Sequence, residues 1–141
     1  MVGSIDMQSM RYLNLFDKLC RVETKYCFKY NNALVFVVPA KKVTMAIGPN
    51  AKNAKMLSAR IGHKIKVIGM ETETTKATLL KFITKLAEPV SITKLELKDD
   101  EITITGGRQA KATLIGRNRM REKELLTILK GLFGIKSIRF N

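Results

Sequence analysis

Hydrophobic and polar positions follow one another along the chain in an order that occurs twice. In the first half, residues 12–20 place their apolar side chains on one helical face and their charged side chains on the other. Two short apolar runs follow, Tyr26–Tyr30 and Leu34–Val38, separated by Asn31 and Asn32, which suit a tight hairpin turn. Two helical segments and a last strand complete the pattern. The predicted order is helix–strand–strand–helix–helix–strand.

The two helical segments of the first half are predicted to meet at a glycine. The pattern indicates a short helix over Lys41–Ile47, then Gly48, then a longer helix over Asn50–Ile61 that stops at Gly62. A strand over Lys64–Ile68 follows.

A shift of 68 residues aligns Ile47-Gly48-Pro49-Asn50 with Ile115-Gly116-Arg117-Asn118, so the second half repeats the first. Its predicted elements are a helix over 79–86, strands Ile92–Lys98 and Ile102–Thr105, helices Arg108–Ile115 and Asn118–Phe133, and a strand Ile135–Phe140. We therefore expect an α+β fold of two domains, residues 1–70 and 71–141. Each would have a three-stranded sheet packed against helices. The junction Gly69-Met70-Glu71 is too short for a flexible linker, so a nearly fixed relation is expected.

Charge indicates what such units would bind. The 141 residues include 26 Lys and Arg against 12 Asp and Glu, a net charge of +14. Nucleic acid is the expected partner, with an anionic membrane surface and unused surface charge as alternatives. Residues 41–70 contain seven basic and no acidic side chains, and residues 102–141 contain nine basic and two acidic ones. The positive charge is thus concentrated in the helix–glycine–helix half of each repeat.

Other functions find little support in the sequence. The longest apolar run, Ala33–Val38, has six residues, and the chain begins without a signal-peptide pattern, so we expect a cytoplasmic protein without a membrane span. Cys20 and Cys27 are expected to be reduced core thiols, and His63 is the single histidine, so neither a metal nor a cofactor is expected. No catalytic motif is present, and we do not expect an enzyme.

Acidic residues cluster around the second predicted hairpin turn. We interpret them as solvent-facing, with a docking point for a basic protein as the alternative. They are Glu96, Asp99, Asp100 and Glu101.

The helix–glycine–helix junction would present the N-terminus of a helix, with its unpaired N–H groups, to a phosphate. Each glycine could also be an ordinary helix C-cap beside a solvated basic face, but repetition at one spacing favours a phosphate cradle. The basic residues that flank the two glycines are Lys41, Lys42, Lys52 and Lys55 in the first copy and Arg108, Lys111, Arg117, Arg119 and Arg121 in the second.

These segments, Ala46-Ile-Gly-Pro-Asn-Ala-Lys-Asn-Ala-Lys-Met-Leu and Leu114-Ile-Gly-Arg-Asn-Arg-Met-Arg, resemble KH domains of the prokaryotic topology, type II. A tandem pair that fills residues 5–141 is similar to the archaeal NusA-like transcription factors. The resemblance implies Gly-X-X-Gly loops that clamp RNA backbone. By position these are Gly48, Pro49, Asn50 and Ala51 in the first copy, and Gly116, Arg117, Asn118 and Arg119 in the second. Both fourth positions depart from the pattern because they are not glycine.

The resemblance implies binding of single-stranded RNA in transcription termination, antitermination or elongation. The low aromatic content, 6%, suits a backbone clamp and an aliphatic groove better than a module that stacks bases on exposed rings. RNA polymerase and ribosomal components are the candidate protein partners. Two alternatives stay open: ribosomal RNA binding in ribosome assembly, and a protein-interaction adaptor whose degenerate loops no longer hold RNA.

Overall fold

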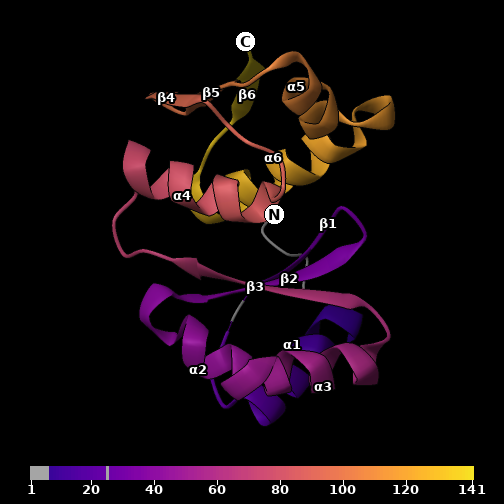
Figure 1. The fold of residues 1–141 in the computed structure, drawn as a ribbon. Helices are drawn as coiled ribbons and strands as arrows, with labels where there is room; N and C mark the ends of the chain where they lie inside the picture. The colour runs from indigo at the N-terminus through magenta and orange to yellow at the C-terminus, as the bar shows by residue number, and fades with distance from the viewer. Residues whose placement is uncertain (1–6, 25) are drawn as a thin grey trace. The chain divides into compact units, whose positions relative to one another are not determined.

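The computed structural model describes residues 7–24 and 26–141, and the chain divides between Thr72 and Glu73 into an N-terminal and a C-terminal unit (Figure 1). The boundary lies two residues from the predicted one. The N-terminal unit has the predicted order of elements. They are α1 (Met7–Cys20), β1 (Tyr26–Tyr30), β2 (Ala33–Pro39), α2 (Val43–Ile47), α3 (Lys52–Ile61) and β3 (Lys64–Met70), with 3-10 turns at Ala40–Lys42 and Pro49–Ala51.

The sheet of the N-terminal unit has the order β1-β2-β3. β1 and β2 are antiparallel and joined at Asn31 and Asn32, whose φ angles of 50° and 63° suit the tight turn that the sequence predicts. β3 pairs in parallel with β2, from Ala33 opposite Lys64 onward. A parallel pair needs a crossover connection, which α2 and α3 supply. In Figure 1, α1, α2 and α3 lie on the same side of this sheet.

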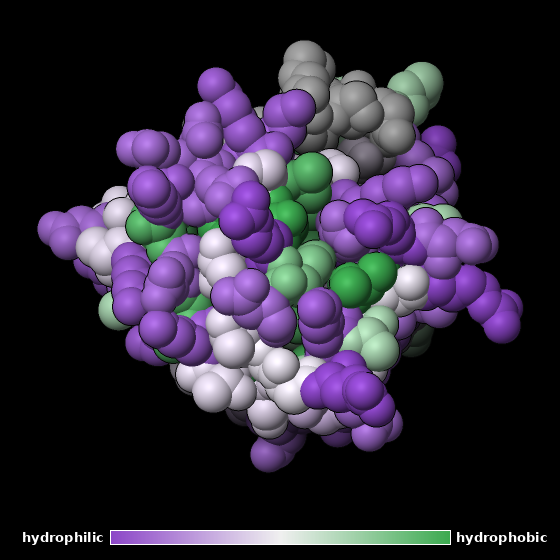
Figure 2. Space-filling view, turned by 90° about the horizontal axis from the view of Figure 1, so that it is seen from above, coloured by the Kyte–Doolittle hydropathy of each residue, from purple (hydrophilic) through white to green (hydrophobic). Residues whose placement is uncertain are grey.

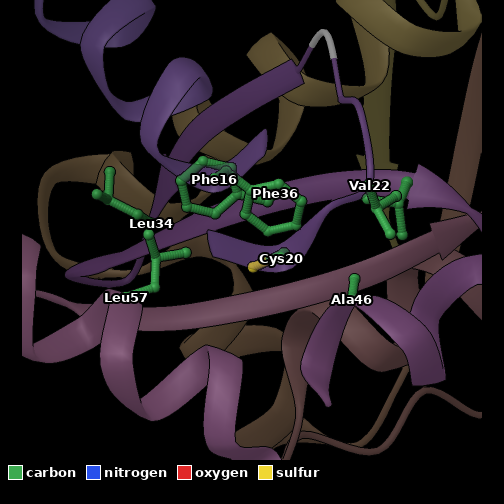
Figure 3. Packing of buried hydrophobic residues seen from close by; sticks show 8 residues of the cluster. Phe16, Cys20, Val22, Leu34, Phe36, Ala46 and Leu57 are labelled. Carbon is green, nitrogen blue, oxygen red and sulfur yellow. The ribbon is translucent and has the colours of Figure 1, made fainter. Parts of the chain in front are cut away.

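The core of this unit lies between the helices and one face of the sheet. Phe16 of α1 and Phe36 of β2 are stacked with ring centroids 4.6 Å apart (Figure 3). Around them lie further buried side chains from α1, β2, α2 and α3: Cys20, Leu34, Val38, Ala46 and Leu57. Because alternate residues of β2 point to opposite faces, Leu34, Phe36 and Val38 form one row toward the helices. This packing fixes α2 and α3 over the sheet.

The C-terminal unit repeats the arrangement. Its elements are α4 (Lys76–Ala87), β4 (Lys94–Lys98), β5 (Glu101–Thr105), α5 (Arg108–Ile115), α6 (Met120–Phe133) and β6 (Ser137–Phe140), with a 3-10 turn at Arg117–Arg119. The sheet order is β4-β5-β6, with β5 and β6 parallel. Phe82 of α4 and Phe133 of α6 meet edge to face at 5.2 Å. Two three-stranded sheets packed with helices confirm the predicted α+β class.

The second faces of the two sheets differ in chemistry. Tyr26, Phe28 and Tyr30 pair with Val37, Val35 and Ala33 across β1 and β2, so that face is apolar. In the C-terminal sheet the corresponding face carries polar side chains, from Lys94, Glu96, Lys98, Thr103, Thr105 and Arg139. Burial of Ile102 and Ile104, but not of Thr103 and Thr105, confirms that β5 is half-buried as its alternation predicts.

The predicted starts of the two longer helices are wrong by two residues. We expected helices from Asn50 and Asn118, whereas α3 begins at Lys52 and α6 at Met120. The reason is a left-handed backbone at the two residues that precede each helix, which interrupts the helical hydrogen-bond pattern. Two other helices begin earlier than predicted, α1 at Met7 rather than residue 12 and α4 at Lys76 rather than residue 79. The remaining bounds differ by a residue or two at the ends: the predicted Lys41–Ile47 is a 3-10 turn followed by α2, and the predicted Ile92–Lys98 begins at Lys94.

Candidate functional site

The two helix–glycine–helix junctions have the same backbone conformation. We call Gly48–Ala51 the first loop and Gly116–Arg119 the second loop. Gly48 has φ 80° and ψ 169°, and Gly116 has φ 75° and ψ 174°. The fourth residues match as closely, at φ 58° and ψ 29° for Ala51 and φ 59° and ψ 24° for Arg119. Although only the glycine and the asparagine are shared, the repeat therefore extends to the dihedral angles of the loops.

Hydrogen bonds connect each loop to the helix before it. The amide of Gly48 donates to the Thr44 carbonyl at 3.0 Å, and that of Gly116 donates to the Ala112 carbonyl at 2.9 Å. The amide of Ala51 in turn donates to the Gly48 carbonyl at 3.2 Å. The first N–H groups of the following helix have no partner within that helix, so each loop ends at a partial positive charge that suits an anion.

Glycine is required at the first position of each loop for two reasons. The positive φ is costly for other residues, and a Cβ there would collide with the helix that follows. At Gly48 a Cβ would lie 2.9 Å from Cγ of Asn53, and at Gly116 it would lie 2.7 Å from Cγ of Arg121. Asn53 is itself held by a hydrogen bond from Nδ2 to the Met45 carbonyl at 3.5 Å. Close packing onto α3 or α6 thus fixes the shape of each loop.

The four lysines that the sequence assigns to the first copy are exposed. Within the described residues no carboxylate pairs with any of Lys41, Lys42, Lys52 and Lys55, and the first turn of α3 contains no acidic residue. Two apolar side chains on the adjoining helices are also exposed, Met45 at 60% and Met56 at 39%. Figure 2 shows another face, seen from above relative to Figure 1, on which hydrophilic side chains surround smaller hydrophobic patches. Cationic and thioether groups near one helix N-terminus can serve phosphates and bases respectively.

The second loop differs because its arginines pair with carboxylates of α6. Arg119 Nη1 lies 3.5 Å from Glu122 Oε1, and Arg121 Nη1 lies 2.9 Å from Glu124 Oε1. Arg119 remains 72% exposed, whereas Arg121 is only 18% exposed. Arg117 is exposed at the tip of the loop.

The predicted phosphate ligands do not all gather at the loops. Arg108 is the first residue of α5, and Gly116 follows its last residue, so these two Cα atoms are about 12 Å apart along the helix axis. Lys111 lies within α5 and is half-buried. Lys41 and Lys42 similarly precede α2, at the end away from Gly48. The residues next to the loops are Lys52, Lys55, Arg117, Arg119 and Arg121, and the others could extend a positive track along the helices.

One feature was not indicated by any motif in the sequence. A pocket of about 500 Å³ lies in the N-terminal unit, where β2 and β3 end at Pro39 and Met70. Its wall includes Lys42 together with Glu23 and Glu71. Of the predicted phosphate ligands only Lys42 lines it, and the two carboxylates make it unsuitable as a phosphate site.

The acidic turn of the C-terminal unit has local partners. Glu96 pairs with Lys94 at 2.7 Å, and this hydrogen-bonded ammonium lowers the pKa of the Glu96 carboxyl. Asp100 lies 3.5 Å from Lys136 Nζ, and Glu101 accepts a hydrogen bond from the Ser137 hydroxyl at 3.1 Å. Each of these three carboxylates therefore has a cationic or hydroxyl partner within the C-terminal unit.

Among the residues described, His, Cys, Asp and Glu side chains form no group of three that could hold a metal ion. Cys20 is buried, which raises the pKa of its thiol to about 11 and makes it a poor nucleophile. None of the helices in the described ranges is both long and apolar enough to cross a membrane.

Comparison with known proteins supports the fold alone. No family model matches the sequence, and no curated protein matches it. A solved structure, the crystal structure of APE1850, is similar with a TM-score of 0.66 and 22% sequence identity over 97% of this chain and 100% of that chain. The two-unit α+β architecture is therefore shared with a protein of the same length range, and the loops must be interpreted from their own chemistry.

Proposed function

We propose that the chain is a single-stranded RNA-binding protein of the NusA-like class, built from two type II KH units, that acts in transcription termination, antitermination or elongation in the cytoplasm. The observation that carries the proposal is the first loop: a glycine-led turn at the N-terminus of α3, followed on that helix by the exposed Lys52 and Lys55, which pair with no carboxylate among the described residues. The element order and the match between the two loops support the assignment to KH units. The role in transcription rests on the family resemblance of the sequence.

In this proposal the chain binds RNA through backbone phosphates. The absence of a side chain at Gly48 lets the backbone approach a phosphate closely, and the partial positive charge at the N-terminus of α3 favours an anion there. Lys52 and Lys55 add charge on the same helix. The exposed thioethers of Met45 and Met56 offer apolar contact to bases without aromatic stacking.

The test is binding of short single-stranded RNAs, measured by fluorescence anisotropy over a salt series. We expect micromolar or tighter affinity that falls steeply with salt, because each phosphate contact contributes about −0.7 to the slope of log K against log salt. Gly48→Asp should weaken binding more than Gly116→Asp. Circular dichroism checks that each variant is folded.

A charge-matched pair separates a site from general attraction. Lys52→Gln with Lys55→Gln removes two charges beside the first loop, and Lys18→Gln with Lys29→Gln removes two exposed charges from α1 and β1. The loop pair should weaken binding at least about fivefold more than the control pair. Equal losses would mean that RNA is attracted by net charge alone, and absence of RNA binding by the wild type would favour the protein-interaction adaptor.

A further inference from the structure

The two loops share a backbone but not an electrostatic environment, and α6 makes the difference. Its third and fifth residues are Glu122 and Glu124, whereas the third and fifth residues of α3 are Ala54 and Met56. Both glutamates lie within 4 Å of an arginine at or beside the second loop. The C-terminal unit therefore supplies anions of its own where the proposed function requires an RNA phosphate.

Glu122 lies in the first turn of α6, where the helix N-terminus favours negative charge. Its carboxylate is 3.5 Å from the guanidinium of Arg119, which occupies the fourth position of the loop. The Glu122 side chain is only 21% exposed, so packing keeps it near the helix end. A phosphate that approaches Arg119 meets a group of the same sign already paired with it.

Glu124 has a different part. Its pair with Arg121 is short, and both side chains are about one-fifth exposed. The stem of Arg121 packs against Gly116, where an added Cβ would lie 2.7 Å from its Cγ. Arg121 and Glu124 thus pack against the loop at Gly116. Of the two paired arginines, the more exposed Arg119 is the one positioned to exchange its glutamate for a phosphate.

We propose that Glu122 is a built-in competitor of phosphate at the second loop, so that RNA is held mainly at the first loop and engages the second only by displacing the Glu122 carboxylate from Arg119. The proposal rests on the proposed RNA-binding function and adds a ranking of its two sites. Ala54 at the equivalent position of α3 leaves the first loop without such a competitor.

The decisive variant is Glu122→Gln, which keeps the shape of the side chain and removes its charge. We expect RNA affinity to rise about threefold at low salt. The salt slope should steepen by about 0.7, corresponding to one more phosphate contact. The matched control is Glu88→Gln in the same unit, because Glu88 is exposed and pairs with Lys85 at 3.7 Å, at the C-terminal end of α4.

A second background tests whether the gain passes through Arg119. In Arg119→Gln the addition of Glu122→Gln should change affinity no more than Glu88→Gln does. A gain that persists without Arg119, or a Glu122→Gln affinity equal to that of the Glu88→Gln control, would overturn the inference. If the wild type binds RNA and responds to Gly48→Asp, these outcomes leave the proposed function standing; failure of the wild type to bind would overturn both.

Discussion

The backbone at the fourth position of the first loop predicts that replacing an alanine by glycine there stabilises the protein. Ala51 has φ 58° and ψ 29°, in the left-handed region that costs an L-residue about 1–2 kcal/mol. Glycine enters this region freely, although its unfolded chain has more conformational entropy, worth about 0.5–1 kcal/mol. The difference predicts that Ala51→Gly stabilises the N-terminal unit by about 0.5–1 kcal/mol, although it removes a side chain.

Urea unfolding of the whole chain, followed by circular dichroism, measures the effect. A unit of this size has a denaturant slope of about 1 kcal/mol per molar urea, so the midpoint of its transition should rise by about 0.5–1 M. The control is Ala59→Gly, which makes the same chemical change at an exposed position inside α3. There the backbone is right-handed, and the substitution should destabilise by about 1 kcal/mol.

The two alanines therefore have opposite expected signs for one chemical change. If Ala51→Gly lowered the midpoint as Ala59→Gly does, the left-handed strain at the loop would be refuted as an energetic feature. Since composition and net charge are identical in the two variants, no effect of either could produce the predicted divergence.

Two further substitutions or conditions test the packing. Gly69→Ala should destabilise the N-terminal unit by about 1–3 kcal/mol in the same urea assay, because its Cβ would lie 2.8 Å from the Cα of Ala40. The control Gly107→Ala adds a Cβ in open space and should cost less than about 1 kcal/mol. Equal changes in urea midpoint for the two variants would contradict the close approach at Gly69. Burial raises the pKa of the Cys20 thiol from 9.0 to about 11, so as pH rises the unfolded state releases this proton before the folded state does. The free energy of unfolding should therefore fall between these pH values, as measured by urea unfolding at several pH values, and it should fall less in a Cys20→Ala variant. The same pH dependence in wild type and variant would contradict the burial.

Periodicity was enough to predict the order of elements, because each helix and strand buries one regular face. The 68-residue repeat placed both loops, and Gly48 and Gly116 signalled them correctly. The left-handed residues could not be foreseen in full. Asn50 and Asn118 are tolerant of that region, but Ala51 and Arg119 are ordinary helix formers, so propensity extended the helices across them. Packing of the glycines onto Asn53 and Arg121 overrides that propensity.

Counting charges along the sequence located both basic blocks, but it did not show that arginines of the second block pair with glutamates of α6. The second block contains Arg119 and Glu122 three residues apart, a spacing that brings side chains together on a helix. The spacing is visible in the sequence, whereas the exposures that separate Arg119 from Arg121 depend on how α6 packs. The pocket near Lys42 likewise could not be predicted from the sequence, because its wall forms where the ends of two strands meet.

The parallel pairing of β2 with β3 also has a consequence for how the chain is made. The β1–β2 hairpin needs only neighbouring residues, but the third strand follows α2 and α3, so the ladder bonds of the N-terminal sheet can all form only after Met70 has been synthesised. The second sheet cannot close until Ser137–Phe140 has been added. Because domains generally fold as units during synthesis, with the N-terminal one first, the first loop would reach its working shape while the second loop, whose Arg119 pairs with Glu122, is still being made.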